Sequence, residues 1–485
     1  MFKIPEKIKI TGGKPVSGKV RISGAKNSVM GLMAASLLTR EKVVLKNVPL
    51  ISDVLLFGSI MQHIGVDIKH SPESREMEIE AKTIKTNVIP ADASKKIRGS
   101  YYFWSALLAR FAITREFDSL VVVSPGGCKI GESTRKYDFH IKLLEKVLGV
   151  TTEEKVDKDG NALLVFTLPE NKKMDDKLTY FSTVRMSHGA TMNFLLASVG
   201  NGTISMLNAS QEPEIEDLLN MLNLMGKDII KINGRNSTGL VKNQLAKPSL
   251  LKGVTYVIMP DRLEAASYAL LAAVTGGEVF IEQCDYNTLT PFLSRFKHCA
   301  DVRIMPNGIF VSAHKDYKDV PLQHMLMTPF PGDETDLHQL WAPLLLKANG
   351  MSEIIDPIWI SRIVHMPELS KMGAKFEAEI VKSEESYSVN SYSTGEHAYI
   401  KIHGNPEFEF KAADMEGPDL RGTCALIWAA CAAKGTSTVS NAKWAIRGYP
   451  NLVKNLRNLG VDVEEIGEDK MSSVPLLPEL EIEFY

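Results

Sequence analysis

The sequence contains few cysteines and no long apolar run. Five cysteines occur in 485 residues, an odd number without a Cys-x-x-Cys pair, which argues against a disulfide framework or a cysteine-based zinc site. Apolar runs such as 424–433 are too short to cross a bilayer. Residues 1–15 include lysines but lack the apolar segment of a signal peptide. These absences favour a cytoplasmic protein.

Familiar cofactor motifs are also missing. Without a Gly-x-Gly-x-x-Gly or Walker loop, the usual nicotinamide and ATP enzymes are disfavoured. Without a His-Glu-x-x-His or comparable pattern, we expect no metal and no other cofactor. The net charge of −2 gives no support to a nucleic-acid or membrane-surface binder.

A helix that closes on Gly or Ala before a short strand recurs along the chain. The closing residues are Gly65, Gly149, Gly226, Ala300, Gly373 and Gly460. Each unit also has an earlier Ala- and Leu-rich helix, expected at 28–38, 98–112, 189–199, 262–274, 336–348 and 420–433. Such a unit cannot bury its apolar faces alone, so we expect six units packed as two globular halves.

A glycine-rich loop at 124–131 contains Cys128 and follows a β-branched run. Backbone N–H groups and the nearby cations Lys129 and Arg135 would lower the pKa of a thiol there and make it an acid or a nucleophile. An ordinary turn with an incidental cysteine is the alternative. From the loop alone the two interpretations are equally weighted.

Basic residues gather at the starts of the Ala-rich helices. A helix dipole disfavours a cation there, so their recurrence predicts a site for a small polyanion. Asp336 is a candidate general base, and the alternative is a helix N-cap. Glu212 could bind hydroxyl groups or lie in a solvated turn. Arg447 is expected to open the helix after the last strand.

Several motifs follow one another along the chain, at 23–27, 125–131, 138–140, 212–214, 260–262, 335–336, 365–369, 419–421 and 447–449. Together, and in this order, they resemble the UDP-N-acetylglucosamine 1-carboxyvinyltransferases, which are enolpyruvyl transferases. The resemblance covers about residues 8–463. It implies an α/β (α+β) fold, a two-domain inside-out α/β barrel of six βαβαββ repeats. One domain would be 26–259 and the other 1–25 plus 260–485, closing around the acceptor.

The resemblance also implies roles by position. Lys26, Arg135 and Arg447 would hold the phosphate of phosphoenolpyruvate, with Arg421 on the carboxylate side. Cys128 would be the acid or covalent partner at the enol carbon, Asp336 the base for the sugar 3-hydroxyl, and Asn27 would position the acceptor. The remaining substrate-binding positions are Arg98, Asp138, His140, Arg185, Ser187, Gly189, Glu212, Arg262 and Arg362.

Departures from the family pattern gather on the nucleotide side. They include a longer Cys128 loop, Lys136 and Tyr137, His188, and a longer segment before Thr335. The acceptor could therefore be another uridine nucleotide or nucleoside, and a silent scaffold is the remaining alternative. The expected partners are phosphoenolpyruvate and a UDP-sugar, with neither nucleic acid nor membrane, in a monomer or a weak homo-oligomer.

Overall fold

The chain forms two compact units, each with its own hydrophobic core. The computed structural model describes residues 4–123, 137–157, 160, 162–170, 179–182, 186–201, 204–227, 229–233, 239–243, 249–382 and 396–468. Unit A comprises the described residues of 24–123 and 137–259, and unit B those of 4–23 and 260–468. Within the described residues, the chain passes between the units at 23–24 and at 259–260.

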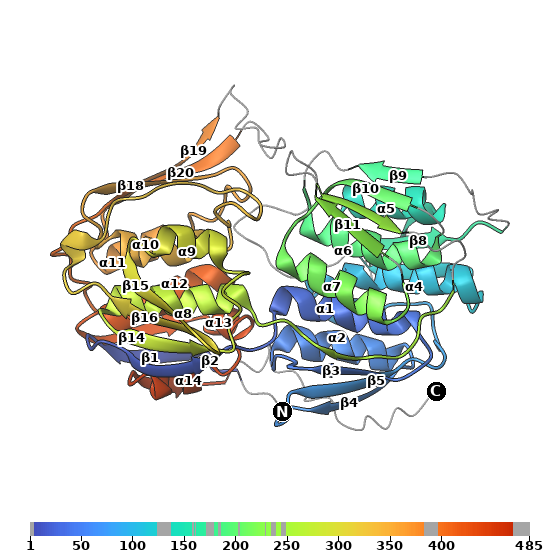
Figure 1. The fold of residues 1–485 in the computed structure, drawn as a ribbon, viewed down its shortest axis with the longest axis horizontal. Coiled ribbons are helices and arrows are strands. Elements are labelled where there is room, and N and C mark those ends of the chain that lie inside the picture. Colours follow the sequence, from blue (N-terminus) through green and yellow to red (C-terminus); the bar gives the residue numbers. More distant parts are fainter. Residues whose placement is uncertain are drawn as a thin grey trace. The chain divides into compact units, whose positions relative to one another are not determined.

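Unit A places its helices between three sheets (Figure 1). Its helices are α1 (Lys26–Ala35), α2 (Ser52–His63), α3 (Ala91–Ser94), α4 (Tyr102–Thr114), α5 (Asp138–Leu148), α6 (His188–Ala197) and α7 (Pro213–Leu224), with the 3-10 turns η1 (Ser36–Leu38), η2 (Arg98–Tyr101) and η3 (Ser198–Gly200). Its strands are β3 (Val43–Lys46), β4 (Asp67–Ser71), β5 (Glu76–Glu80), β6 (Ser119–Val123), β7 (Thr151–Val156), β8 (Ala162–Thr167), β9 (Thr179–Ser182), β10 (Ile204–Ala209), β11 (Ile229–Asn233), β12 (Gly239–Asn243) and β13 (Thr255–Val257). The sheet orders are β13-β3-β5-β4, β6-β8-β7 and β11-β12-β10-β9.

Unit B repeats this organisation. Its helices are α8 (Arg262–Thr275), α9 (Thr290–Phe296), α10 (His338–Leu345), α11 (Met366–Lys371), α12 (Leu420–Ala432), α13 (Lys443–Ile446) and α14 (Leu452–Asn458), with η4 (Tyr317–Asp319). Its strands are β1 (Lys7–Gly12), β2 (Ser17–Arg21), β14 (Glu278–Glu282), β15 (Ala300–Met305), β16 (Gly308–Ala313), β17 (His324–Leu326), β18 (Met351–Asp356), β19 (Phe376–Lys382), β20 (Glu396–His403), β21 (Asp414–Glu416), β22 (Gly435–Ser440) and β23 (Asp462–Ile466). The sheet orders are β15-β16-β14-β2, β17-β18-β20-β19 and β21-β22-β1-β23.

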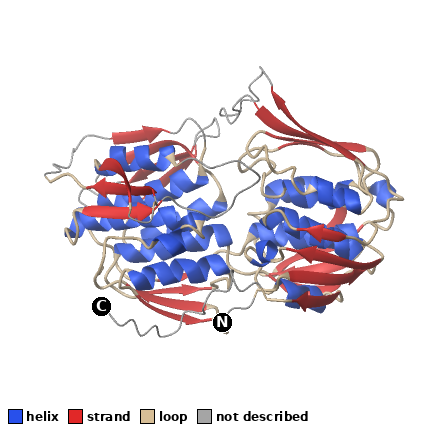
Figure 2. Ribbon diagram, turned by 180° about the vertical axis from the view of Figure 1, so that it is seen from behind, coloured by secondary structure: helices blue, strands red, loops and turns tan. Residues whose placement is uncertain are grey.

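The helices that follow the first strand of each repeat form the centre of each unit. In unit A, α1, α4 and α6 contact one another, and in unit B, α8, α10 and α12 do the same. Most side chains of these helices are apolar or small, and α6, α8 and α12 are buried over nearly their whole length, as expected for a helix inside a core. Figure 2 shows strands on the periphery of each unit and helices within it. The predicted α/β fold with helices inside sheets is confirmed.

The six sheets follow one βαβαββ pattern, with informative exceptions. The leading strand of a sheet pairs parallel to the strand after the central helix, as β9 does with β10 and β17 with β18. In two sheets this leading strand comes from a chain crossing: β2 pairs with β14, and β13 with β3. In the β6-β8-β7 sheet, the described residues provide a single parallel bridge at that place, Val88 to Val121.

Asparagine recurs at or next to the end of the inner strand of the repeat. Asn47, Asn208 and Asn441 follow or end β3, β10 and β22 with φ of 61°, 57° and 54°. Gln283, with φ 56°, takes the same place after β14. Asparagine tolerates the left-handed region better than most side chains, so the recurring Asn turn has a backbone cause. No described helix has the length and apolarity that a bilayer span requires.

Candidate active site

The predicted site residues of unit A lie at or near the starts of helices. Lys26 is the first residue of α1, and its Nζ lies 3.1 Å from the carboxylate of Asp53 in the first turn of α2. Asp53 is 2% exposed. The buried carboxylate offsets the unfavourable dipole at the start of α1 and fixes the ammonium group. Cys128, Arg135 and Arg185 lie outside the described residues.

An aromatic stack lies beside Arg98, the first residue of η2. The Arg98 guanidinium carbon is 5.8 Å from the ring centroids of both Tyr101 and Tyr137. The Tyr101 ring stacks on His140 at 4.4 Å between centroids. Asp138 lies in the first turn of α5, two residues before His140. This part of unit A therefore combines one guanidinium with flat ring faces.

His140 is a neutral member of that stack. It is buried, and Asn193 Nδ2 lies 2.9 Å from His140 Nδ1. The Asn193 carbonyl oxygen accepts from Ser105 Oγ at 2.6 Å, so its NH₂ donates to the histidine and Nδ1 carries no proton. Burial, together with the positive charge of Arg98, lowers the pKa of His140 to about 3. His140 cannot act as a cation toward an anionic ligand near neutral pH.

Ser187 and Gly189 shape the start of α6. The hydroxyl of Ser187 accepts from the Ala190 backbone N–H at 3.3 Å, which is an N-cap. A Cβ on Gly189 would lie 2.6 Å from Tyr101 Oη and 3.1 Å from His140 Cε1. Glycine at this position therefore lets the aromatic stack approach the helix start.

His188 and Glu212 form an ion pair between α6 and α7. Burial opposes protonation of His188, but Glu212, Glu214 and the Asn27 backbone raise its pKa. Ser210 Oγ also donates to the same Glu212 oxygen, at 3.0 Å. That oxygen of Glu212 is thus engaged by two donors within unit A, so hydroxyl binding by Glu212 remains a prediction.

In unit B, Asp336 is held by Arg362. Arg362 Nη2 forms an ion pair with the Asp336 carboxylate, and Arg362 Nη1 donates to the Thr335 carbonyl. The Asp336 side chain remains 33% exposed, while that of Arg362 is 4% exposed. Leu337, not Asp336, occupies the N-cap of α10. The N-cap interpretation of Asp336 is therefore wrong, and a partly accessible carboxylate held by a guanidinium remains.

Arg421 lies at the start of α12 and is anchored from two directions. Asp419 caps the helix by accepting from the Arg421 and Gly422 backbone N–H groups, both at 3.0 Å. Arg421 Nη1 donates to Tyr449 Oη at 2.7 Å, and its guanidinium carbon lies 5.2 Å from the Tyr449 ring centroid. Burial opposes the charge, but Tyr449 and the carboxylates of Asp336 and Asp261 raise the pKa of Arg421.

The Tyr449 hydroxyl has a defined direction. Tyr449 Oη is 2.8 Å from Ser267 Oγ, and Ser267 Oγ donates to the Leu263 carbonyl at 2.6 Å. Ser267 has a single hydroxyl proton, so Tyr449 donates to Ser267 and accepts from Arg421. A continuous chain of hydrogen bonds therefore fixes the Arg421 guanidinium.

Arg447 differs from its prediction. It is the C-cap of α13 and is 8% exposed, and the next helix begins only at Leu452. The expectation that Arg447 opens a helix is therefore wrong. A cation at a helix C-terminus is favoured by the dipole, so Arg447 needs no compensating carboxylate for that reason.

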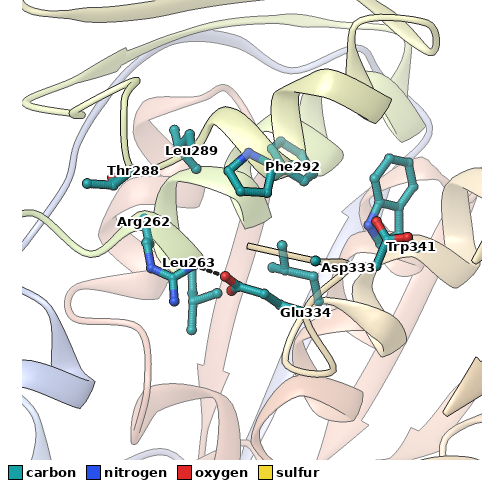
Figure 3. A pocket seen from close by; sticks show the side chains of 11 residues that line it. Arg262, Leu263, Thr288, Leu289, Phe292, Asp333, Glu334 and Trp341 are labelled. Carbon is teal, nitrogen blue, oxygen red and sulfur yellow. Dashed lines mark hydrogen bonds and ion pairs between the residues drawn. The ribbon is translucent and has the colours of Figure 1, made fainter. Parts of the chain in front are cut away.

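A pocket in unit B lies beside the ion pair between Arg262 and Glu334 (Figure 3). Thr288, Phe292 and Trp341 contribute to its walls. Arg262 begins α8 and is 6% exposed. The lining combines apolar side chains with the charged side chains of Arg262, Asp333 and Glu334.

Sequence reasoning missed the partners that hold these residues. Asp53 fixes Lys26, and Asp356 accepts from Thr335 Oγ1 at 2.6 Å. Both carboxylates are distant in sequence from what they hold, and neither lies in a motif. Their only signal was a charged residue in an otherwise apolar segment.

Comparisons with known proteins agree along the whole chain. The family model for EPSP synthase (3-phosphoshikimate 1-carboxyvinyltransferase) matches residues 10–465. UDP-N-acetylglucosamine 1-carboxyvinyltransferase 2 of Streptococcus mutans is 34% identical over 464 residues, covering 95% of this chain and 100% of the relative. The protein of the same name from Lactococcus lactis is 33% identical over 477 residues, covering 96% of this chain and 100% of the relative.

The solved structures agree on the fold. The crystal structure of the enolpyruvyl transferase NikO from Streptomyces tendae matches with a TM-score of 0.76 and 21% identity, covering 95% of this chain and 99% of that one. At this identity the likeness concerns the fold alone. With a family match over nearly the full chain and full-length relatives above 30% identity, the chain belongs to the EPSP synthase family of enolpyruvyl (carboxyvinyl) transferases.

Proposed function

We propose that this protein transfers the enolpyruvyl group of phosphoenolpyruvate to the 3-hydroxyl of UDP-N-acetylglucosamine and releases phosphate. The observation that carries the proposal is the full-length identity of 33–34% to UDP-N-acetylglucosamine 1-carboxyvinyltransferases. The product would enter peptidoglycan precursor synthesis. Both substrates are charged metabolites that do not cross membranes unaided, so the reaction takes place in the cytoplasm.

Addition and elimination need a base for the hydroxyl and an acid for the methylene carbon. Asp336 takes the base role in the proposal, supported by its accessible carboxylate and its guanidinium partner Arg362. Cys128 takes the acid or covalent role. A base that is ionised and held in one orientation removes a proton without first reorganising.

Binding of phosphoenolpyruvate requires cations for a phosphate and a carboxylate. We assign the phosphate to Lys26, Arg135 and Arg447, and the carboxylate to Arg421 with Arg447. The anchored guanidinium of Arg421 supports this assignment, because a planar fork held in place grips a carboxylate at low entropic cost. Units A and B would be the two domains, with boundaries at 26–259 and at 1–25 plus 260–485.

The test is phosphate release from phosphoenolpyruvate with a panel of uridine acceptors. Release that depends on UDP-N-acetylglucosamine supports the proposal, and absence of release with every acceptor would overturn it. Cys128→Ser should also abolish covalent labelling by the epoxide phosphonate fosfomycin. Undiminished labelling of that variant would remove Cys128 from its role.

A second candidate is enolpyruvyl transfer to another uridine nucleotide or nucleoside. The ion pair between His188 and Glu212 favours it, because a charged imidazole at the start of α6 changes the groups offered to an acceptor. In the same assay, release only with a different uridine acceptor would select this alternative.

A further inference from the structure

A buried carboxylate behind the proposed base has every acceptor position filled. Asp356 ends β18 and is fully buried. Its Oδ1 accepts from the Ile358 and Trp359 backbone N–H groups, both at 2.9 Å. Its Oδ2 accepts from Thr335 Oγ1 at 2.6 Å and faces His338 Nδ1 at 2.9 Å. Four donors on one carboxylate hold it ionised and fixed.

His338 completes this set from the first turn of α10. It is fully buried, and its Nδ1 must carry a proton because the Asp356 oxygen can only accept. His338 Nε2 has no hydrogen-bond partner among the described residues. Burying an imidazole nitrogen without a hydrogen bond costs free energy of folding, so the hydrogen bond made by the other nitrogen has to offset that cost. Its one hydrogen bond goes to Asp356.

Asp356 and His338 are connected to Asp336 through Thr335. Thr335 is the preceding residue, its hydroxyl is held by Asp356, and its carbonyl is held by Arg362 Nη1. The other Arg362 nitrogen, Nη2, binds the Asp336 carboxylate. The peptide between Thr335 and Asp336 is therefore held at the hydroxyl, at the carbonyl and at the acid itself.

We propose that His338 and Asp356 are positioning residues for Asp336, acting through the Thr335 hydroxyl. The inference rests on the proposed function, in which Asp336 removes the acceptor proton. Without the pair, Thr335 could rotate, the distance between Arg362 and Asp336 would vary, and the carboxylate would lose both its orientation and part of its ion pair. Loss of the pair therefore slows proton removal by Asp336, while phosphoenolpyruvate binding is retained.

The charged surroundings of the pair decide the direction of the pH effect. Asp356 faces His338 from α10 and the field of Arg362 from the segment after β18, and these oppose the effect of burial so that its pKa is lowered. His338 also faces His365, at 6.2 Å between ring centroids. Asp336 faces Arg362, and its charge also acts on Arg421 of α12. A weaker pairing with Arg362 therefore moves the acidic limb of the kcat profile to higher pH.

The experiment compares variants that remove one donor at a time with variants that restore it. His338→Leu removes the Nδ1 donor, whereas His338→Asn places an amide N–H near the same position. Thr335→Val removes the hydroxyl, and Thr335→Ser keeps it. Leu344→Ala, at another buried position of the same helix, is the control for a general loss of stability. Each variant is assayed for kcat, for KM of phosphoenolpyruvate, for the pH profile of kcat and for Tm.

For His338→Leu and Thr335→Val we expect a kcat lower by roughly 10- to 100-fold, an unchanged KM for phosphoenolpyruvate and an acidic limb at higher pH. His338→Asn and Thr335→Ser should recover most of the loss. The double variant His338→Leu/Thr335→Val should have a kcat only slightly below that of either single variant, because both substitutions remove a donor to Asp356.

Two results would overturn the inference. One is that His338→Leu and Thr335→Val both retain wild-type kcat and pH profile. The other is that Leu344→Ala, at a similar Tm, shows the same loss and the same shifted limb. The wild-type assay is a separate readout: if it turns over no uridine acceptor, the proposed function fails before the positioning pair is tested.

Discussion

Two buried aspartates, one in each unit, have pKa values shifted in opposite directions from the ordinary value. Asp217 of unit A is hydrogen-bonded to Ser28 Oγ, to Tyr256 Oη at 2.7 Å and to the Met259 N–H at 3.4 Å. Burial nevertheless raises its pKa to about 6, since these donors are neutral and Glu214 adds a like charge. Asp356 of unit B is buried more deeply, yet its pKa is lowered.

The difference comes from the neighbours of each carboxylate: His338 and Arg362 act on Asp356, whereas the donors to Asp217 are neutral. Burial alone disfavours a carboxylate, and neutral donors recover only part of that cost. Asp356 has one more donor than Asp217 and also faces Arg362 and His338. A buried carboxylate can therefore stay ionised in unit B, where guanidinium groups are close, but is partly protonated near pH 6 in unit A.

The same contrast holds for the surrounding groups. Unit A offers aromatic faces and a histidine, His140, that stays neutral because its pKa is about 3. Near Asp336, unit B offers pairs of a guanidinium with a carboxylate, namely Arg262 with Glu334 and Arg362 with Asp336. We therefore expect substitutions at the ion pairs of unit B to change turnover, and substitutions at the aromatic stack and at Asp217 of unit A to change acceptor affinity and stability.

The largest effect is expected at Asp336. Asp336→Asn keeps the shape of the side chain and removes the base, so phosphate release should fall by about 100-fold or more. The Kd of the acceptor, measured by calorimetry, should stay within about 3-fold of wild type, because loss of the base affects the proton transfer and not the binding of the acceptor in the ground state. Normal turnover in Asp336→Asn would remove Asp336 from the reaction and erase the contrast between the units.

The next effect concerns the stability of unit A as a function of pH. The folded-state pKa of Asp217 is about 6, above its ordinary value of 3.8, so its proton stabilises the fold at low pH. That contribution is present below about pH 4 and is lost as pH rises through about 6. Across this window, wild type should lose about 2–3 kcal/mol that Asp217→Asn retains.

Urea unfolding of both proteins at pH 4.5, 6 and 7.5 measures this difference. Wild type and Asp217→Asn should diverge as pH rises, with the variant gaining in relative stability. Parallel curves would mean that Asp217 is ionised throughout and that the two units do not differ in this way.

The repeat was predictable from sequence because its signals are local. The helix-closing Gly or Ala residues and the Ala- and Leu-rich segments recur in the sequence itself, and apolar faces that one unit cannot bury predict that the units pack together. Cations at helix starts were visible for the same reason. The repeat follows from such local patterns, whereas the α/β barrel fold and the family were implied by the resemblance of the ordered motifs.

The pairings were not predictable, because they join residues far apart in sequence. Nothing near Lys26 points to Asp53, and nothing near Thr335 points to Asp356. Arg447 was misplaced because the short helix α13 ends where a helix start was expected. Protonation states were also hidden, since they depend on burial and neighbours that only the folded chain brings together.

A smaller effect is expected at Tyr449, which sharpens the role of unit B in substrate binding. Tyr449→Phe removes the acceptor of the Arg421 hydrogen bond and keeps the ring beneath the guanidinium. We expect kcat/KM for phosphoenolpyruvate to fall by about 10-fold. Tyr317→Phe, which removes a hydroxyl bonded to the Ala273 and Val274 carbonyls, is the matched control and should change nothing. Equal losses in both variants would argue for a general effect on unit B.

The smallest effect is expected at Gly189 in unit A. An added methyl group would lie 2.6 Å from Tyr101 Oη, so Gly189→Ala should displace the stack and raise KM for the acceptor by about 5-fold. KM for phosphoenolpyruvate should not change, because Gly189 has no charged side chain and forms no ion pair itself. Adding Tyr101→Phe removes the clashing oxygen and should recover part of the loss. If Gly189→Ala instead lowers kcat at an unchanged acceptor KM, the aromatic stack of unit A takes part in turnover, and its assignment to acceptor binding is wrong.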